Sequence, residues 1–272
     1  MRNRSLSDSR RRVRSAWDRL RGLQRLTAAA ASGSLAATGL SLLAAALFHG
    51  TLASQETGLP FAEDERLSYT IDWPSGLSVG SAEFRARFVD PGWRLQATLR
   101  ATLPEIEVDD AFVARTDEAL CSIAFEKHVR HGEKRAHESL RFGPGAVRRT
   151  NLEGGPAHTP GVEPAGSCAH DALAYLYHLR RDLAAGRIPP PADLFFGAPY
   201  RVTLRHAQTR HIVLRGERLL ADEIRAVVRG PASEHSFSVY FGRDAARTPL
   251  IFRVEVEGTP FTMQLAEEAE ED

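Results

Sequence analysis

The sequence predicts a mainly β protein, in which a strongly curved antiparallel sheet or open β-barrel packs against one helix. Three observations predict this fold class: stretches with an apolar residue at every second position, turn residues between them, and one segment with apolar residues at helical spacing. A sheet of many antiparallel strands has to curl or close in order to protect its edges. The sequence also predicts an apolar helix before this domain.

Alternation is clearest in three consecutive segments, at residues 67–73, 82–88 and 93–101. A period of two places the apolar side chains on one face of a strand and the polar side chains on the other. The Asp, Pro and Gly residues at 90–92 are typical of a turn between the last two segments. We therefore expect an antiparallel meander with one face in water.

Weaker alternation predicts further strands, for a total of about ten to twelve. They lie near 109–117, 120–131, 135–143 and 146–150, and later near 200–204, 212–214, 224–228, 237–241, 250–256 and 261–265. Residues 151–167 are rich in Gly and Pro and are expected to form a loop.

The predicted helix occupies about residues 170–185. Leu173 and Leu176 begin an apolar stripe at helical spacing, and Gly186 suits the position that follows the last turn. The prolines within 187–193 prevent the helix from continuing. We expect this helix to pack on the concave side of the sheet or across its mouth.

The formal net charge of zero hides a separation of charge along the chain. Residues 1–25 contain nine Arg and two Asp, a local charge of +7, so the remaining residues carry −7. A basic stretch can bind nucleic acid, but beside an apolar segment it is typical of the cytosolic flank of a membrane signal. Because the rest of the chain is acidic, we expect no nucleic-acid partner.

Residues 26–49 follow this basic cytosolic segment and are expected to be a signal peptide or a membrane anchor helix. The stretch 26–48 is uncharged and is about as long as the ~20 residues that span a bilayer. Cleavage after Ala53 would use a poor small-x-small site, which favours the anchor. The expected location is the periplasm or cell envelope, with the inner membrane as a partner of residues 26–49.

Three further parts complete the expected domain organisation. Residues 50–61 are a predicted linker, 62–266 the exported β domain and 267–272 an acidic tail. A β domain of about two hundred residues is large enough to bury a core of its own.

Three blocks of this domain resemble a known family when they are taken in order. They read ERLSYTIDW at 65–73 with GLSVGSA at 76–82, HDALAYLYHLR at 170–180, and VYFGRDAARTPL at 239–250 with GTPFTMQL at 258–265. The blocks resemble a bacterial exported family known only as domain-of-unknown-function family 3108, whose pattern has Pro at Ala172 and Trp-Ser-like residues at 241–242. The resemblance implies an exported, mostly antiparallel β domain and no particular activity.

Cys121 and Cys168 are the two cysteines of the chain. In an exported protein such a pair is a disulfide candidate, the alternative being two separate buried thiols. Closing the loop between them would stabilise the fold by about 3–4 kcal/mol in the loop-entropy model. We favour the disulfide.

Asp171, Arg180 and Asp244 are the candidate binding residues, and no residue is assigned a catalytic role. Asp171 adjoins His170, which suggests a catalytic set, but an acid in the first helical turn also favours the positive end of the helix. Arg180 falls on or beside the apolar stripe of the helix. A buried Arg requires a carboxylate, so it is expected to pair with an acid such as Asp244 or to line a pocket.

The histidines suggest a metal site only weakly. His128 and His131 point to opposite faces of a regular strand, so with His137 they are expected to lie on a solvated face. His206 and His211 form another loose pair. The sequence contains no Gly-rich phosphate loop and no nucleophile elbow, and we expect neither a metal nor another cofactor.

The expected function is that of a non-enzymatic envelope protein, which binds an apolar ligand such as a lipid, or an envelope protein, in its curved sheet. The export segment, the inward aromatic side chains and the lack of catalytic motifs favour this interpretation. Two alternatives remain open: a periplasmic hydrolase that uses Asp171 or a His cluster, and a structural or assembly module of the envelope.

Overall fold

The computed structural model describes residues 58–103, 106–153, 159–162, 167–231, 233–256 and 258–266, which belong to one compact unit. The predicted basic segment, the apolar helix at 26–49 and the acidic tail lie outside the described residues. Within the described part of the chain, no helix is long and apolar enough to cross a membrane.

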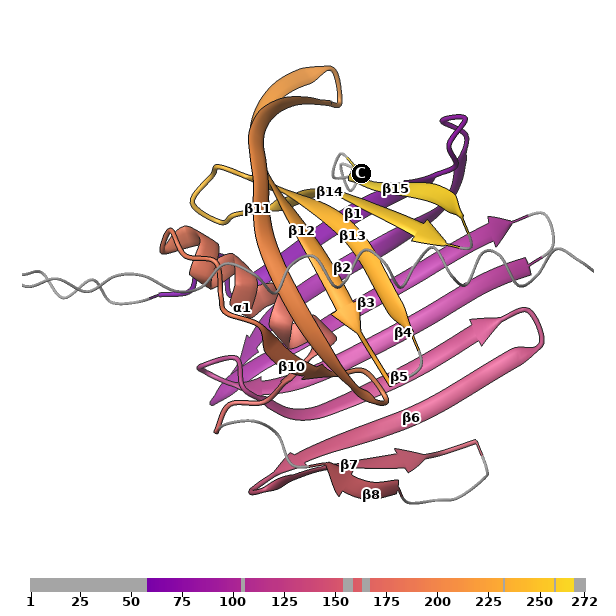
Figure 1. Ribbon diagram of the computed structural model, residues 1–272, viewed down its shortest axis with the longest axis vertical. Coiled ribbons are helices and arrows are strands. Elements are labelled where there is room, and N and C mark those ends of the chain that lie inside the picture. Colours follow the sequence, from indigo (N-terminus) through magenta and orange to yellow (C-terminus); the bar gives the residue numbers. More distant parts are fainter. Residues whose placement is uncertain are drawn as a thin grey trace, which may run out of the picture. The chain divides into compact units, whose positions relative to one another are not determined.

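The described strands form a single sheet that curls around a helix without closing (Figure 1). Its order is β8-β7-β6-β5-β4-β3-β2-β1-β15-β14-β13-β12-β11-β10-β9. The strands are β1 Asp64–Asp72, β2 Ser78–Val89, β3 Gly92–Leu103, β4 Ile106–Asp117, β5 Ser122–His131, β6 Lys134–Gly143, β7 Ala146–Asn151, β8 Thr159–Val162, β9 His170–Asp171, β10 Ala192–Phe195, β11 Pro199–Leu214, β12 Glu217–Arg229, β13 Glu234–Gly242, β14 Pro249–Val256 and β15 Thr259–Leu265. The predicted fold class is thereby confirmed as a mainly β protein with a curved, open sheet.

The first three strands form the predicted antiparallel meander. Tyr69 of β1 pairs with Ala82 of β2, which in turn pairs with Leu99 of β3. Tyr69 also pairs with Leu265 of β15, so the first and last strands in the sequence lie side by side in the sheet. The alternating apolar residues of these strands face the helix, because only that face is covered.

Two local predictions were incomplete. The segment 151–167, expected to be a loop, contains β8, which pairs with β7 through Val147 and Val162. The two-residue strand β9 runs parallel to β10 through His170 and Leu194, whereas all strands had been expected to be antiparallel. Strands this short have no alternation to detect, since their pairing is set by the neighbouring strand.

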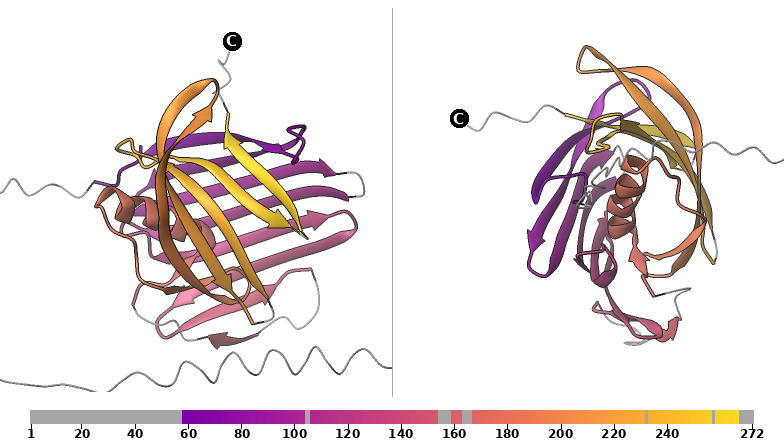
Figure 2. Two further views of the ribbon diagram at one scale, coloured as in Figure 1. Left: turned by 45° about the horizontal axis from the view of Figure 1, so that its top comes forward. Right: turned by 90° about the vertical axis from the view of Figure 1, so that its left-hand side faces the viewer.

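The helix α1, Ala172–Ala184, lies on the concave side of the sheet (Figure 2). Asp171 is its N-cap, and Gly186 follows its end with a φ of +72°, a conformation that Gly adopts without strain. The predicted stripe faces the sheet: Leu173 is 6% exposed, and Leu176 is half-buried. A helix seated inside a curled sheet buries apolar side chains from both in a core, while a separate apolar cluster that includes Ile212, Tyr240 and Ile251 packs without the helix.

Phe61 extends this core beyond the first strand. It is buried, and its ring centroid lies 5.1 Å from that of Trp93 and 4.9 Å from that of Tyr177 on α1. The end of the segment assigned to the linker therefore packs as part of the β domain.

Candidate functional site

An apolar pocket of about 200 Å³ lies between α1 and the concave face of the sheet. Leu173 and Leu176 of α1 form one wall, and Phe196, from the turn between β10 and β11, forms another. The sheet contributes Ala82, Phe84, Ala97, Thr98, Leu99, Phe112, Phe125 and Met263. An apolar pocket of this kind favours apolar groups over water, as apolar cavities engineered in other proteins do.

Three charged side chains adjoin the pocket on its β5 side. Lys127 is two residues after the pocket residue Phe125 and therefore faces the same side of the sheet. Its Nζ lies 4.9 Å from the ring centroid of Phe196 and 3.0 Å from Oε2 of Glu138. Arg149 of β7 donates a hydrogen bond to the other carboxylate oxygen, Oε1. We call Lys127, Glu138 and Arg149 the inner charge cluster.

Burial alone would raise the pKa of Glu138. The hydrogen bonds and positive charges of Lys127 and Arg149 outweigh this effect and hold the pKa below its ordinary value. The inner charge cluster therefore contains one carboxylate and two cations at neutral pH, a net charge of +1.

The turn between β10 and β11 covers this cluster closely. Gly197 has a φ of +81°, and a Cβ at this position would lie 2.4 Å from Oε2 of Glu138 and 3.0 Å from Nζ of Lys127. The positive φ favours glycine here, and a Cβ would also displace the ends of the Glu138 and Lys127 side chains. Phe196 beside it contacts Phe112 and Phe125 at centroid distances of 5.3 and 5.6 Å.

Asp171 caps the helix from a fully buried position. Its Oδ1 accepts hydrogen bonds from the backbone N–H groups of Leu173 and Ala174 at 2.8 and 2.9 Å, and its Oδ2 accepts one from Ser122 at 2.6 Å. Burial raises the pKa of Asp171 to about 6, although these hydrogen bonds act in the opposite direction. The hydrogen bonds of Asp171 thus hold α1 against β5, and they do not connect it to a histidine.

Arg180 is fully buried and forms a two-bond ion pair with Glu65 of β1, at 2.6 and 2.7 Å. Its Nε also donates to the carbonyl of Ala246 at 3.1 Å. The expectation that this Arg pairs with a carboxylate is confirmed, but the proposed partner was wrong. Asp244 instead accepts hydrogen bonds from the backbone N–H and hydroxyl of Thr248, because it closes the turn between β13 and β14.

The structure contains the Cys121–Cys168 disulfide that the sequence predicts. It ties the start of β5 to the segment before β9, where the backbone N–H of Ser122 also donates to the carbonyl of Ala169 at 2.8 Å. His170 lies beside the disulfide, with Nε2 3.5 Å from the Cys168 sulfur. Burial, together with the nearby His178 and Arg181, lowers the pKa of His170 to about 4, so the ring is neutral at pH 7.

The other histidines do not converge on a shared metal-binding point within the described residues, where no group of three metal-ligating side chains occurs. His128 and His137 are cross-strand neighbours with ring centroids 5.1 Å apart. Nε2 of His131 lies 3.1 Å from Oδ2 of Asp110, and Nε2 of His206 lies 3.2 Å from the hydroxyl oxygen of Thr209.

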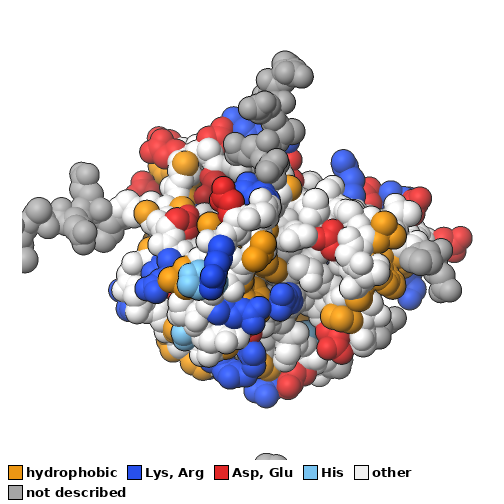
Figure 3. Space-filling view, turned by 90° about the horizontal axis from the view of Figure 1, so that it is seen from above, with side chains coloured by type: hydrophobic (Ala, Val, Ile, Leu, Met, Phe, Trp, Pro, Cys, Tyr) orange, Lys and Arg blue, Asp and Glu red, His pale blue; other side chains and the backbone are white. Residues whose placement is uncertain are grey.

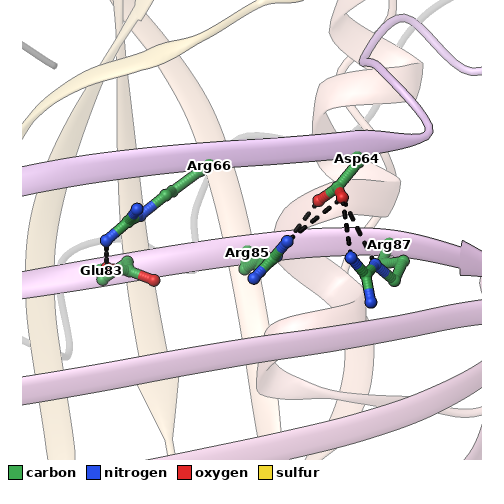
Figure 4. Close-up of polar contacts among 5 residues, drawn as sticks. All are labelled: Asp64, Arg66, Glu83, Arg85 and Arg87. Atoms are coloured by element: carbon green, nitrogen blue, oxygen red, sulfur yellow. Dashed lines mark hydrogen bonds and ion pairs between the residues drawn. The ribbon is translucent and has the colours of Figure 1, made fainter. Parts of the chain in front are cut away.

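The outer face of the sheet is polar at β1 and β2. Asp64 binds Arg85 and Arg87, and Arg66 binds Glu83, all on β1 and β2 (Figure 4). Viewed from above, acidic and basic side chains share the surface with exposed hydrophobic side chains (Figure 3). Charge of both signs therefore lies outside. The concave side is mainly apolar, and its charged groups include the inner charge cluster, the Arg180–Glu65 pair, Asp171 and the pair of Asp110 and His131.

Sequence reasoning missed Glu65 and the inner charge cluster. A signal for them existed, because Glu65 is in phase with the apolar residues Leu67 and Tyr69, and Lys127 is in phase with Phe125. A charged residue that falls at the buried positions of a strand breaks the apolar pattern, and its burial requires a partner of opposite charge or a hydrogen bond.

The fold and the pocket together define a barrel-like β protein with an internal helix. The chain belongs to the family described as protein of unknown function (DUF3108), whose model matches residues 68–266. Among curated proteins, none matches the chain significantly.

A solved structure shares the fold at low sequence identity. A β-barrel-like protein with domain of unknown function DUF1849 from Brucella abortus is 10% identical, with a TM-score of 0.55 over 75% of this chain and 96% of that one. Two others have lower TM-scores. One is a protein from Bacteroides fragilis, described as exported and with a YmcC-like fold. Its TM-score is 0.32 at 8% identity, over 76% of this chain and 96% of that one. The other is described as a lipoprotein, from Parabacteroides distasonis. Its TM-score is 0.31 at 8% identity, over 77% of this chain and 97% of that one.

Proposed function

We propose that this protein binds an apolar ligand of the cell envelope in the pocket between α1 and the sheet. The observation that carries the proposal is the pocket itself, because a core packed to ordinary density leaves few voids larger than a water molecule. A volume of about 200 Å³ accommodates a slender apolar group, such as part of an acyl chain.

Two features support a site of action outside the cytoplasm. The first is the Arg-rich N-terminus followed by an uncharged apolar segment, which is typical of export. The second is the Cys121–Cys168 disulfide, since such bonds persist in oxidising compartments. An exported protein with an apolar pocket meets lipids and other apolar envelope components as its most abundant ligands.

The hydrolase alternative required a cleft in which either Asp171 and a histidine, or several histidines, lie within hydrogen-bond reach of each other. Asp171 is instead fully buried, and its oxygens accept from Ser122 and the first turn of α1. This geometry supports a capping role for Asp171, and therefore favours ligand binding over hydrolysis as the function to test first.

The test is lipid extraction from the purified full chain, followed by mass spectrometry and by titration with hexadecanol. We expect an apolar molecule to co-purify and hexadecanol to compete with it. The variant Ala97→Leu fills part of the pocket and should lower the amount bound several-fold. Ala111→Leu is the matched control, since Ala111 precedes the pocket residue Phe112 on β4 and so faces the other side of the sheet.

Equal binding by both variants would place the ligand elsewhere. A wild-type chain that carries no apolar molecule and takes up no hexadecanol would refute the proposal.

A further inference from the structure

The inner charge cluster is unusual for its location. Lys127 and Glu138 expose only 15% and 10% of their side chains, on a concave face whose neighbouring positions are aromatic and aliphatic. Burying charges is costly even when they are paired, and replacing them by apolar residues often leaves stability unchanged or increases it. Stability alone is therefore a weak reason for charges at this position.

The cluster is also incompletely balanced. Two cations share the single carboxylate of Glu138, which leaves a net charge of +1 beside the pocket. Within the described residues, the buried Nε of Arg149 has no hydrogen-bond acceptor. Arg149 itself is 35% exposed, so a ligand can approach its guanidinium, and a cation with an unused buried donor is complementary to an anionic group that is not part of this fold.

The cluster and the pocket meet at Phe196. The ring of Phe196 lines the pocket, packs against Phe112 and Phe125, and stacks under Nζ of Lys127. Its neighbour Gly197 lies directly over Glu138 and Lys127. This turn joins β10 to β11, near one open edge of the sheet, whereas Lys127 and Glu138 belong to β5 and β6. The aromatic side chain thus separates an apolar compartment from a cationic one.

We propose that the ligand is a single-chain amphiphile with an anionic head, whose chain occupies the pocket and whose head binds Lys127 and Arg149. This inference rests on the apolar-ligand function proposed above and adds the chemical class of the ligand. The pocket holds only part of a long chain, and a ligand that extends past Phe196 lies next to Lys127 and Glu138, which contact this turn. Carboxylate and phosphate heads share the required charge and acceptors.

The experiment compares three ligands on the full chain at pH 8: palmitate, a lysophosphatidate with the same chain, and hexadecanol, which has the chain without the charge. Dissociation constants come from displacement of a polarity-sensitive fluorophore bound in the pocket. We expect at least one of the two anionic ligands to bind about tenfold more tightly than hexadecanol, as one charge-assisted hydrogen bond provides. The tighter of the two shows whether the head is a carboxylate or a phosphate.

Four variants locate the head. Lys127→Gln should remove the preference for the anionic ligand, while Lys127→Arg should retain most of it. Lys134→Gln is the matched control, because Lys134 is the other lysine of the chain and is exposed at the start of β6. Glu138→Gln removes the internal anion and should increase the preference, a gain that misfolding cannot produce.

The outcomes separate the two proposals. If the three ligands bind wild type equally well, the anionic head is refuted while the apolar-ligand function stands. If none binds, both proposals fail. An anionic preference that Lys127→Gln leaves intact and Glu138→Gln does not increase would refute the inner charge cluster as its site.

Discussion

Two neighbouring acids of β1 show how differently the two faces of this sheet use charge. Asp64 points outward, where 49% of its side chain is exposed, and binds Arg85 and Arg87 (Figure 4). Glu65 points inward, where 12% of its side chain is exposed, and binds Arg180, which is not exposed at all. Both acids accept charge-assisted hydrogen bonds from arginine, so the contrast lies in the surroundings.

The surroundings decide how much each of these ion pairs contributes to stability. The hydrogen bonds from Arg85 and Arg87 hold the pKa of Asp64 below its ordinary value, but water and salt screen such exposed pairs. The buried pair of Arg180 and Glu65 has no such screening, and it anchors α1 to the strand at the centre of the sheet. Losing one partner there leaves a buried charge uncompensated.

The largest effect is expected for Glu65→Gln. It leaves Arg180 buried without a carboxylate and should destabilise the fold by about 3–5 kcal/mol. Urea denaturation followed by circular dichroism measures this as a fall in the midpoint. Glu63→Gln, at an exposed position two residues earlier, is the control. A midpoint for Glu65→Gln equal to that of wild type would contradict the comparison.

An intermediate effect, dependent on pH, is expected for Asp171. Its pKa is raised from 3.8 to about 6 in the folded chain, so ionisation costs more in the folded state than in the unfolded one. The protonated form therefore stabilises the fold fully below pH 3.8, and this stabilisation is lost as the pH rises through 6. The total loss in the free energy of unfolding is on the order of 3 kcal/mol. Asp171→Asn remains neutral and should lack this loss.

The measurement is urea denaturation of wild type and Asp171→Asn at several pH values from 4 to 7. The free energy of unfolding of wild type should fall relative to that of the variant as the pH rises. Asp64→Asn is the exposed control: the pKa of Asp64 is lowered, so any contribution of its ion pairs is lost as the pH falls, and screening by water and salt keeps that contribution small. A constant difference between wild type and Asp171→Asn would mean that Asp171 does not titrate in this range.

The smallest effect is expected for Asp64→Asn at neutral pH. Water and salt screen the pairs with Arg85 and Arg87, and the two arginines are themselves partly exposed. We expect the denaturation midpoint at physiological salt to stay within measurement error of wild type. A loss comparable to that of Glu65→Gln would show that exposure does not distinguish the two faces.

Local sequence patterns predicted the elements well and their partners poorly. The alternation of Leu67, Tyr69 and Ile71 placed β1 and its buried face, and helical spacing placed α1 within two residues of its start. The same alternation places Glu65 on the buried face, yet it could not show that Arg180 meets it. That contact spans 115 residues and depends on where α1 lies inside the sheet.

The sequence by itself determined the mainly β class, the helix, the two cysteines that pair and the family to which the chain belongs. These follow from periodicity, composition and short motifs, which are properties of neighbouring residues. Only the tertiary structure decided how far the sheet curls, which side chains enclose the pocket, and that Phe196 stands between that pocket and Lys127. Such contacts arise from the twist and curvature of many strands together, which no single strand encodes.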